Sequence, residues 1–197
     1  SMIFGKVYNA RWTIERTRRD HGLRVDEEAL ASASASLKQA LPNIRQAEGL
    51  DELRGLEGKT AALYFSVLDN LILNQKETFS FHGRSRRPPM DEMNAILSFV
   101  YTLLAKDCAA ALESVGLDPY VGFLHRDRAG RESLSLDLME ELRAPIGDRF
   151  SLTLINNRQI TDKQIQKQLG GMVSLTDDGR KKLLTAWQEK KREVITL

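Results

Sequence analysis

Helical periodicity constrains the fold of this chain more than any other feature, because it extends through nearly the whole sequence. Apolar residues recur at spacings of three and four, in segments bounded by glycine, proline or capping residues. The predicted helices cover 6–21, 26–41, 50–73, 90–115, 133–157 and the segment after Thr176. Two short β-like pieces, 158–160 and 172–175, lie on either side of a capping box formed by Thr161 and Gln164. We therefore predict a mainly α, multi-helix domain with a short two-stranded β element near 158–175.

Proline and glycine interrupt this pattern at a few places. Residues 74–90 form the one long irregular stretch, because two prolines and a glycine disfavour a helix there. Prolines at positions 42 and 145 are expected to break or kink the helices that contain them. No internal repeat or low-complexity linker divides the chain. We expect residues 6–197 to form one domain, with residues 1–5 as an added N-terminal remnant and linker.

The composition excludes several classes of protein. The chain has 29 basic and 27 acidic residues, so any nucleic-acid site must come from local clustering of charge rather than from the net charge of +2. Its one cysteine, Cys108, excludes a disulfide framework and a cysteine-based zinc site. No apolar run approaches the roughly 18 residues of a membrane span, and no signal-peptide pattern begins the chain. We expect a soluble, cytoplasmic protein with no membrane partner.

Three carboxylates form an acidic stripe on the otherwise leucine-rich segment 133–143. At 100° per residue, Glu140 and Glu141 lie about 60° and about 40° on either side of Asp137. Like charges at this spacing repel each other. Burial would sharply raise the free-energy cost of keeping all three carboxylates ionised unless cations compensate. A divalent metal or an arginine would relieve the repulsion. A solvated stripe on a half-buried helix is the alternative.

Glu57 and His125 are the other two unusual positions. Glu57 lies between Gly55 and Gly58, and each glycine weakens a helix by roughly 1 kcal/mol relative to alanine. Close approach of the backbone to another group would explain them, and an ordinary glutamate near a helix start is the alternative. His125 follows the apolar passage 121–124 and is either a packed core histidine or a ligand. A glutamate, a histidine and a further carboxylate together suit Mn²⁺ or Mg²⁺ better than Zn²⁺.

Arginines gather in two loops near these positions. The first loop carries Arg84, Arg86 and Arg87, and the second carries Arg126, Arg128 and Arg131. Arginine binds phosphate in a bidentate manner, so both loops are candidate DNA contacts, although either alone could be an ordinary solvated loop. Lys59 lies two residues from Glu57 and is a candidate for offsetting negative charge on a phosphate.

Several motifs of the chain resemble those of the CRISPR-associated spacer-acquisition integrases, the first protein of the CRISPR adaptation pair. They are Gly-Leu-Glu-Gly at 55–58, Gly-Arg-Ser-Arg-Arg-Pro-Pro-Met-Asp-Glu-Met-Asn at 83–94, Gly-Phe-Leu-His-Arg-Asp-Arg-Ala-Gly-Arg at 122–131 and Ser-Leu-Asp-Leu-Met-Glu-Glu-Leu-Arg at 135–143. The resemblance covers essentially the whole chain in order. It is closest to the bacterial forms of the subtype I-C kind.

The resemblance implies a metal-dependent DNA endonuclease and integrase that inserts short DNA fragments into the CRISPR array. It implies that Glu57, His125 and Glu140 are the catalytic residues and hold Mg²⁺ or Mn²⁺. Asp137 matches a further acidic position, which either binds the ion directly or acts through water. Asn94 and Glu141 match motif positions that are expected to support the site.

The resemblance also implies partners: DNA, a second copy in the full-length protein, and the small second CRISPR-associated adaptation protein. Members of the family begin with a β-rich dimerisation domain, and nothing in these 197 residues has that pattern. We therefore expect this chain to be the helical catalytic domain of such a protein. The alternative is a non-catalytic helical DNA-binding or interaction module, which would account for the arginine loops but not for the acidic stripe.

Overall fold

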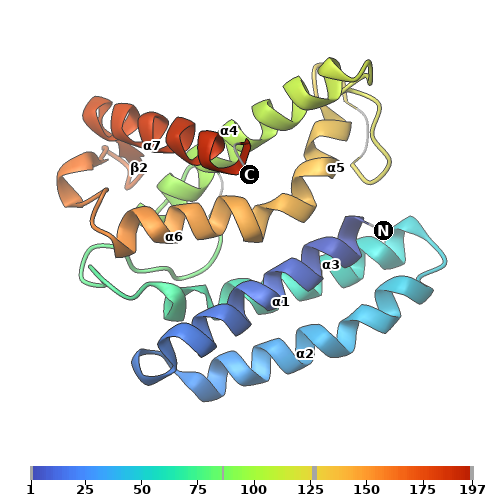
Figure 1. Cartoon of the computed structure of the whole chain (residues 1–197), viewed down its shortest axis with the longest axis horizontal. Helices are drawn as coiled ribbons and strands as arrows, with labels where there is room; N and C mark the ends of the chain where they lie inside the picture. The colour runs from blue at the N-terminus through green and yellow to red at the C-terminus, as the bar shows by residue number, and fades with distance from the viewer. Residues whose placement is uncertain (1, 86, 126–127, 196–197) are drawn as a thin grey trace.

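The structure of the chain is a computed structural model, which describes residues 2–85, 87–125 and 128–195. It is mainly α-helical with one small sheet, as predicted (Figure 1). The α-helices are α1 (Met2–His21), α2 (Glu27–Gln46), α3 (Leu50–Ser66), α4 (Glu92–Ser114), α5 (Ser133–Leu142), α6 (Arg149–Asn156) and α7 (Asp177–Ile195). Short helical segments are η1 (Gly22–Arg24), η2 (Leu68–Leu71), η3 (Arg143–Asp148) and η4 (Asp162–Gln164), and the strands are β1 (Ile165–Lys167) and β2 (Val173–Leu175).

Helix α1 lies at the centre of the fold, against α2 and α3 on one side and against α5 and η3 on the other (Figure 1). Its buried apolar residues, Ile3, Val7, Ala10 and Ile14, recur at helical spacing and form one stripe. The helix begins at Met2 rather than at Lys6, and Ile3 is only 1% exposed. The prediction that residues 1–5 are a linker is therefore wrong for residues 2–5, which belong to the folded domain.

Helices α2 and α3 differ in length from their predictions. Asp26 caps α2 by accepting a 3.0 Å hydrogen bond from the Ala29 N–H, but the helix continues past Pro42 to Gln46. An exposed proline removes one backbone donor without ending the helix. Helix α3 ends at Ser66, and the apolar spacing that predicted a longer helix continues in the 3₁₀ segment η2. A spacing of three fits a 3₁₀ segment as well as an α-helix.

Helix α4 is the apolar helix predicted at 90–115, and it begins at Glu92 behind the cap Asp91. By length and composition alone it could cross a membrane, so the expectation that no segment reaches that threshold is wrong. Half of its most apolar window is buried inside the protein, and core helices of soluble proteins pass the same test. Four apolar residues of α4 are fully buried: Met93, Ile96, Leu97 and Val100. Helix α4 is therefore a core helix, packed against α5, η3, α6 and β2.

The predicted helix 133–157 is observed as three consecutive segments, α5, η3 and α6. The middle segment η3 contains Pro145 and has π-helical geometry, which widens the helix where the proline lacks an N–H. The predicted kink is thus confirmed. It sets α5 and α6 at an angle to each other (Figure 1), and α5 packs against α1 and α4.

The small sheet pairs β1 with β2 in antiparallel register, with Ile165 opposite Leu175. The predicted capping box of Thr161 and Gln164 is confirmed. Residues 158–160 do not form a strand, because their N–H groups donate to carbonyl groups in the last turn of α6. A strand needs those donors for its neighbour.

Candidate metal-binding and phosphodiester site

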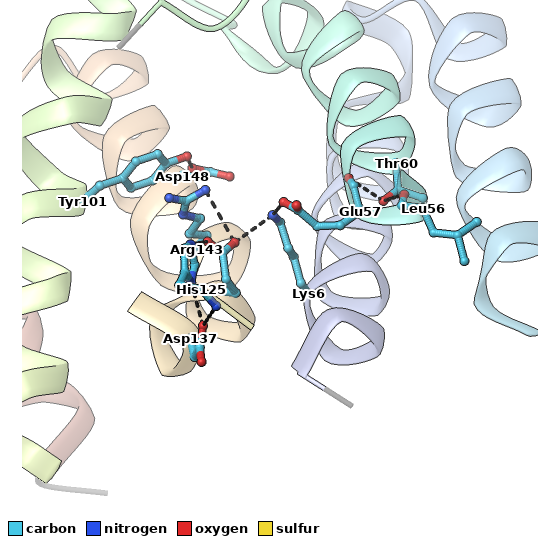
Figure 2. Close-up of polar contacts among 10 residues, drawn as sticks. Lys6, Leu56, Glu57, Thr60, Tyr101, His125, Asp137, Arg143 and Asp148 are labelled. Atoms are coloured by element: carbon cyan, nitrogen blue, oxygen red, sulfur yellow. Dashed lines mark hydrogen bonds and ion pairs between the residues drawn. The ribbon is translucent and has the colours of Figure 1, made fainter. Parts of the chain in front are cut away.

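A cluster of charged side chains lies where α1, α3 and α5 meet (Figure 2). Glu57 comes from α3 and Glu140 from α5, and both pair with Lys6 of α1. The Lys6 ammonium contacts Glu57 Oε1 and lies 2.7 Å from Glu140 Oε2. The fold therefore brings two of the predicted metal-binding carboxylates to the same cation.

Glu140 is nearly buried, with 3% of its surface exposed. Burial raises its pKa, but the nearby charges of Arg143 and Lys6 outweigh burial and hold the pKa below its ordinary value. Arg143 Nη1 lies 3.5 Å from Glu140 Oε2, and its guanidinium stacks over the Tyr101 ring at 4.7 Å. Glu140 is therefore an ionised carboxylate at neutral pH, as a metal ligand must be.

His125 is oriented by Asp137, which is fully buried. The Asp137 carboxylate accepts backbone N–H groups from Phe123, Leu124 and His125 at 2.6, 2.9 and 3.0 Å. It also contacts His125 Nδ1 at 2.6 Å. Burial raises the pKa of Asp137, but these hydrogen bonds lower it further, so that it lies below its ordinary value.

The hydrogen bond at Nδ1 directs the other ring nitrogen of His125 toward Glu140. His125 Nε2 lies 3.9 Å from Glu140 Oε1. A carboxylate that fixes one imidazole nitrogen and leaves the other for a ligand is the usual arrangement behind a metal-bound histidine. Both Asp137 oxygens accept hydrogen bonds from the 123–125 segment, so Asp137 orients His125, and direct binding of an ion by Asp137 stays a prediction.

Close packing at Gly122 makes the contacts of Asp137 with the 123–125 segment possible. A Cβ atom added at Gly122 would lie 2.6 Å from Ser133 Cβ and 3.1 Å from Asp137 Oδ2. Arg54 of α3 donates to the Leu124 carbonyl at 2.8 Å. The histidine segment is therefore held between α5 and α3.

The predicted metal ligands lie near one another but do not form a coordination site as they stand. Among residues 2–85, 87–125 and 128–195, no three histidine, cysteine, aspartate or glutamate side chains lie close enough to hold an ion as they stand. Lys6 separates Glu57 from Glu140 instead. Glu140 Oε2, although beside Lys6, makes no hydrogen bond of normal geometry within the described structure.

Lys6 is the site residue that the sequence reasoning missed. It lies beside the buried stripe of α1, about 40° from Ala10 on the helical wheel. This closeness to the buried face was the one feature of the sequence that could have indicated a role for Lys6. Lys59, the lysine singled out from the sequence, is exposed instead. The charge that lies next to Glu57 comes from a residue 51 positions away.

A broad hollow of about 740 Å³ opens beside Glu57, between α3 and residues 81–84. Arg84 lines it and donates to Asn94 Oδ1 at 2.6 Å and to Ser98 Oγ at 3.1 Å. Asn94 in turn holds this loop, because it accepts from the Ser85 N–H and donates to the Gly83 carbonyl. Gly58 also lines the hollow, and a Cβ there would meet no protein atom within 4 Å.

The other predicted residues are spread around this centre. Arg87 and Arg128 are exposed and Arg131 is half-buried, while Arg86 and Arg126 lie outside the described residues. Glu141 packs against α1, since a Cβ added at Gly5 would lie 2.8 Å from its Cδ. Its backbone carbonyl accepts a 2.8 Å hydrogen bond from Asn9. Glu141 therefore joins α5 to α1 and does not face His125.

The fold and the site define a class: an α-helical domain with a carboxylate and imidazole centre beside a hollow that an arginine lines. The chain belongs to the family described as CRISPR associated protein Cas1, whose model matches residues 1–189. The resemblance found in the sequence is thereby confirmed at the level of the family, and the subtype stays a prediction.

Two curated relatives illustrate the match. CRISPR-associated endonuclease Cas1 2 of Rhodospirillum rubrum is 54% identical over 197 residues, which cover 98% of this chain and 57% of that protein. CRISPR-associated endonuclease Cas1 of Leptospira interrogans is 44% identical over 195 residues, which cover 99% of this chain and 76% of that protein. The chain spans little more than half the length of the Rhodospirillum rubrum relative.

Solved structures share the fold. A casposase bound to integration product matches with a TM-score of 0.79 and 26% identity, covering 95% of this chain and 50% of that one. A Cas1 protein from Thermotoga maritima matches with a TM-score of 0.78 and 28% identity, covering 98% of this chain and 59% of that one. The helical arrangement is thus common to this chain and these longer proteins.

Proposed function

We propose that this chain is the helical domain of a metal-dependent DNA endonuclease and integrase that acts in CRISPR spacer acquisition. The observation that carries the proposal is that Glu57 and Glu140 pair with the same Lys6 ammonium while His125 Nε2 lies 3.9 Å from Glu140 Oε1, so that donors from three separate segments surround Glu140. Family membership supports it, because the curated relatives are named endonucleases and one structural neighbour is bound to an integration product.

The donor set fits a divalent ion of the Mg²⁺ or Mn²⁺ type. Two carboxylates and one imidazole form a mixed oxygen and nitrogen set, and the buried Glu140 Oε2 lacks a regular hydrogen bond in the described structure. Glu57, His125 and Glu140 would hold the ion. Bound there, it would polarise the scissile phosphate and stabilise charge on the attacking or leaving oxygen.

The remaining residues of the site bind and position. Asp137 keeps His125 Nε2 directed toward Glu140, and Arg143 keeps Glu140 ionised. The hollow beside Glu57 is the proposed phosphate path, with Arg84 on its wall. The nucleophile would be a DNA 3′-hydroxyl in integration and water in cleavage. In both cases its oxygen forms a new bond to phosphorus and gives up its proton, while the phosphodiester bond to the leaving DNA oxygen breaks and that oxygen takes up a proton.

The proposed partners are DNA, a second copy of the full-length protein and the second adaptation protein. A structural neighbour with 27% identity and a TM-score of 0.81 is a partial complex of Cas6-RT-Cas1 with Cas2. Because this chain shares a fold with that structure, we propose a partner of the Cas2 kind for it.

Substitution of the three ligands tests the proposed function. Glu57→Gln, His125→Asn and Glu140→Gln should each reduce Mn²⁺-dependent cleavage of duplex DNA by about 100-fold or more, because each removes a donor. Glu52→Gln is a matched control, since Glu52 is an exposed glutamate on the same helix as Glu57. Circular dichroism on each variant separates lost chemistry from unfolding.

Two outcomes are decisive. Normal cleavage by folded Glu57→Gln or His125→Asn would show that these residues do not share an ion, and would favour the non-catalytic DNA-binding alternative. Asp137→Asn should give a partial loss, since it disturbs the orientation of His125 and leaves the three donors in place. A loss as complete as that of Glu140→Gln would instead make Asp137 a ligand.

A further inference from the structure

Lys6 holds an unusual position for a lysine. Its side chain is only 11% exposed, and its ammonium pairs at once with Glu57 of α3 and Glu140 of α5 (Figure 2). Lysine is rarely buried to this extent unless it is paired. The side chain comes from the central helix α1 and therefore reaches the point between the two carboxylates from the protein interior.

The charges around Lys6 explain why a cation is needed at this point. Glu57 and Glu140 both place an oxygen beside one nitrogen, and without a cation between them the two carboxylates would repel each other. Arg143 reaches only Glu140, at 3.5 Å. Lys6 is therefore the group that joins the two carboxylates in this structure.

A divalent ion would need the same place. Its ligand oxygens would be those that Lys6 now contacts, and ligand bonds of about 2.1 Å leave no room for an ammonium between the same two oxygens. A dication and an ammonium that share ligands would also repel each other. Ion and ammonium therefore exclude each other.

We propose that Lys6 is a built-in cation that occupies the divalent-metal position between Glu57 and Glu140 and has to leave before an ion can bind. The inference rests on the proposed function, because it assumes that these carboxylates bind a metal. Lys6 keeps the carboxylates close together in the metal-free protein, and it lowers their affinity for the ion. The ion therefore binds only when its concentration, or the added affinity of a bound phosphate, overcomes the ion pairs of Lys6.

Metal binding measured directly tests this role without using catalysis as the readout. The titration follows Mn²⁺ with the protein alone, by the electron paramagnetic resonance signal of free Mn²⁺ and by isothermal calorimetry. Lys6→Met removes the charge and keeps an unbranched side chain that is one atom shorter. We expect its Kd for Mn²⁺ to fall at least about tenfold below that of the unchanged protein, because no ion pair has to be broken.

Lys59→Met is the matched control. It removes an exposed lysine two residues from Glu57, and we expect it to leave the Kd unchanged. The double variant Lys6→Met with Glu140→Gln should lose the gain in Mn²⁺ affinity. Such a loss would show that the tighter binding in Lys6→Met takes place at Glu140. Lys6→Gln covers the case in which Lys6→Met does not fold, since its amide can still donate to a carboxylate, and it should show the same tightening.

The outcomes separate this inference from the proposed function. Equal or weaker Mn²⁺ binding by folded Lys6→Met and Lys6→Gln, with ordinary binding by the unchanged protein, would overturn the role of Lys6 alone. Absence of Mn²⁺ binding in all of these proteins would overturn the metal site and with it the inference. A similar gain in the Lys59→Met control would show that only the net charge matters, and would also overturn it.

Discussion

Asp148 offers the sharpest test of the energetics behind the site. It is 1% exposed and lies at the end of η3, where the Tyr101 hydroxyl donates to its carboxylate. Burial raises the pKa of Asp148 to about 6, against the opposing effects of the tyrosine hydroxyl and of Arg143. The pKa of the Asp148 carboxyl group therefore lies close to neutral pH. Its neighbour Arg143 in turn contacts Glu140.

The raised pKa translates into a cost in stability above pH 6. The unfolded value is 3.8 and the folded value about 6, and each unit corresponds to about 1.4 kcal/mol, which gives about 3 kcal/mol. Because the folded state binds the proton more tightly, this stability is fully present below pH 4 and is lost as the pH rises to 6. Asp148→Asn cannot ionise and keeps an oxygen for Tyr101, so it avoids the cost.

The perturbation is therefore Asp148→Asn, measured by thermal unfolding at pH 5 and pH 8. The variant should be more stable by about 3 kcal/mol at pH 8 and by about half of that at pH 5. For a domain of this size the gain at pH 8 corresponds to a rise of about 6–12 °C in Tm. Glu113→Gln, at an exposed position of α4, should show no such pH dependence. A variant that is less stable than the unchanged protein at pH 8, or equally changed at both pH values, would refute the reasoning.

Three further predictions concern the arginine loop, the histidine segment and helix α3. Arg87→Ala should reduce the steepness of the plot of log K for duplex DNA against log salt concentration by about 0.9, as expected for one lost phosphate contact. Arg180→Ala on α7 should leave this slope unchanged. If filter binding gives equal slopes for Arg87→Ala and the unchanged protein, Arg87 does not contact DNA. Gly122→Ala should cost about 1–3 kcal/mol in urea unfolding, because its Cβ would lie 2.6 Å from Ser133 Cβ. Gly58→Ala meets open space and should instead stabilise α3 by up to about 1 kcal/mol, so destabilisation there would contradict the structure.

Local patterns in the sequence were sufficient for most of the secondary structure. Caps such as Asp26 and Thr161 act within a few residues, and their predicted hydrogen bonds are confirmed. Helix ends were harder to place, because an apolar spacing of three fits both an α-helix and the 3₁₀ segment η2. The strand prediction at 158–160 failed because those N–H groups bond back to α6, which the sequence pattern does not reveal.

The sequence by itself also marked Glu57, His125 and the acidic stripe of α5, through glycines, an apolar passage and carboxylates among leucines, and the family resemblance then chose Glu140 from the stripe. Those signals were chemical oddities within short windows. The sequence pattern alone could not separate Asp137 from Glu140, which lie on the same face of one helix. The structure gives them different surroundings, because four contacts to the 123–125 segment use both oxygens of Asp137.

Only the tertiary structure decided which charges meet. It places Lys6, from a different helix, beside Glu57, whereas Lys59, a near neighbour of Glu57 in sequence, is exposed. Helical periodicity gives the direction of a side chain around its own axis but not the element against which that face packs. The balance of charge at this site depends on the packing of α1 against α3 and α5, and that packing is a property of the whole chain.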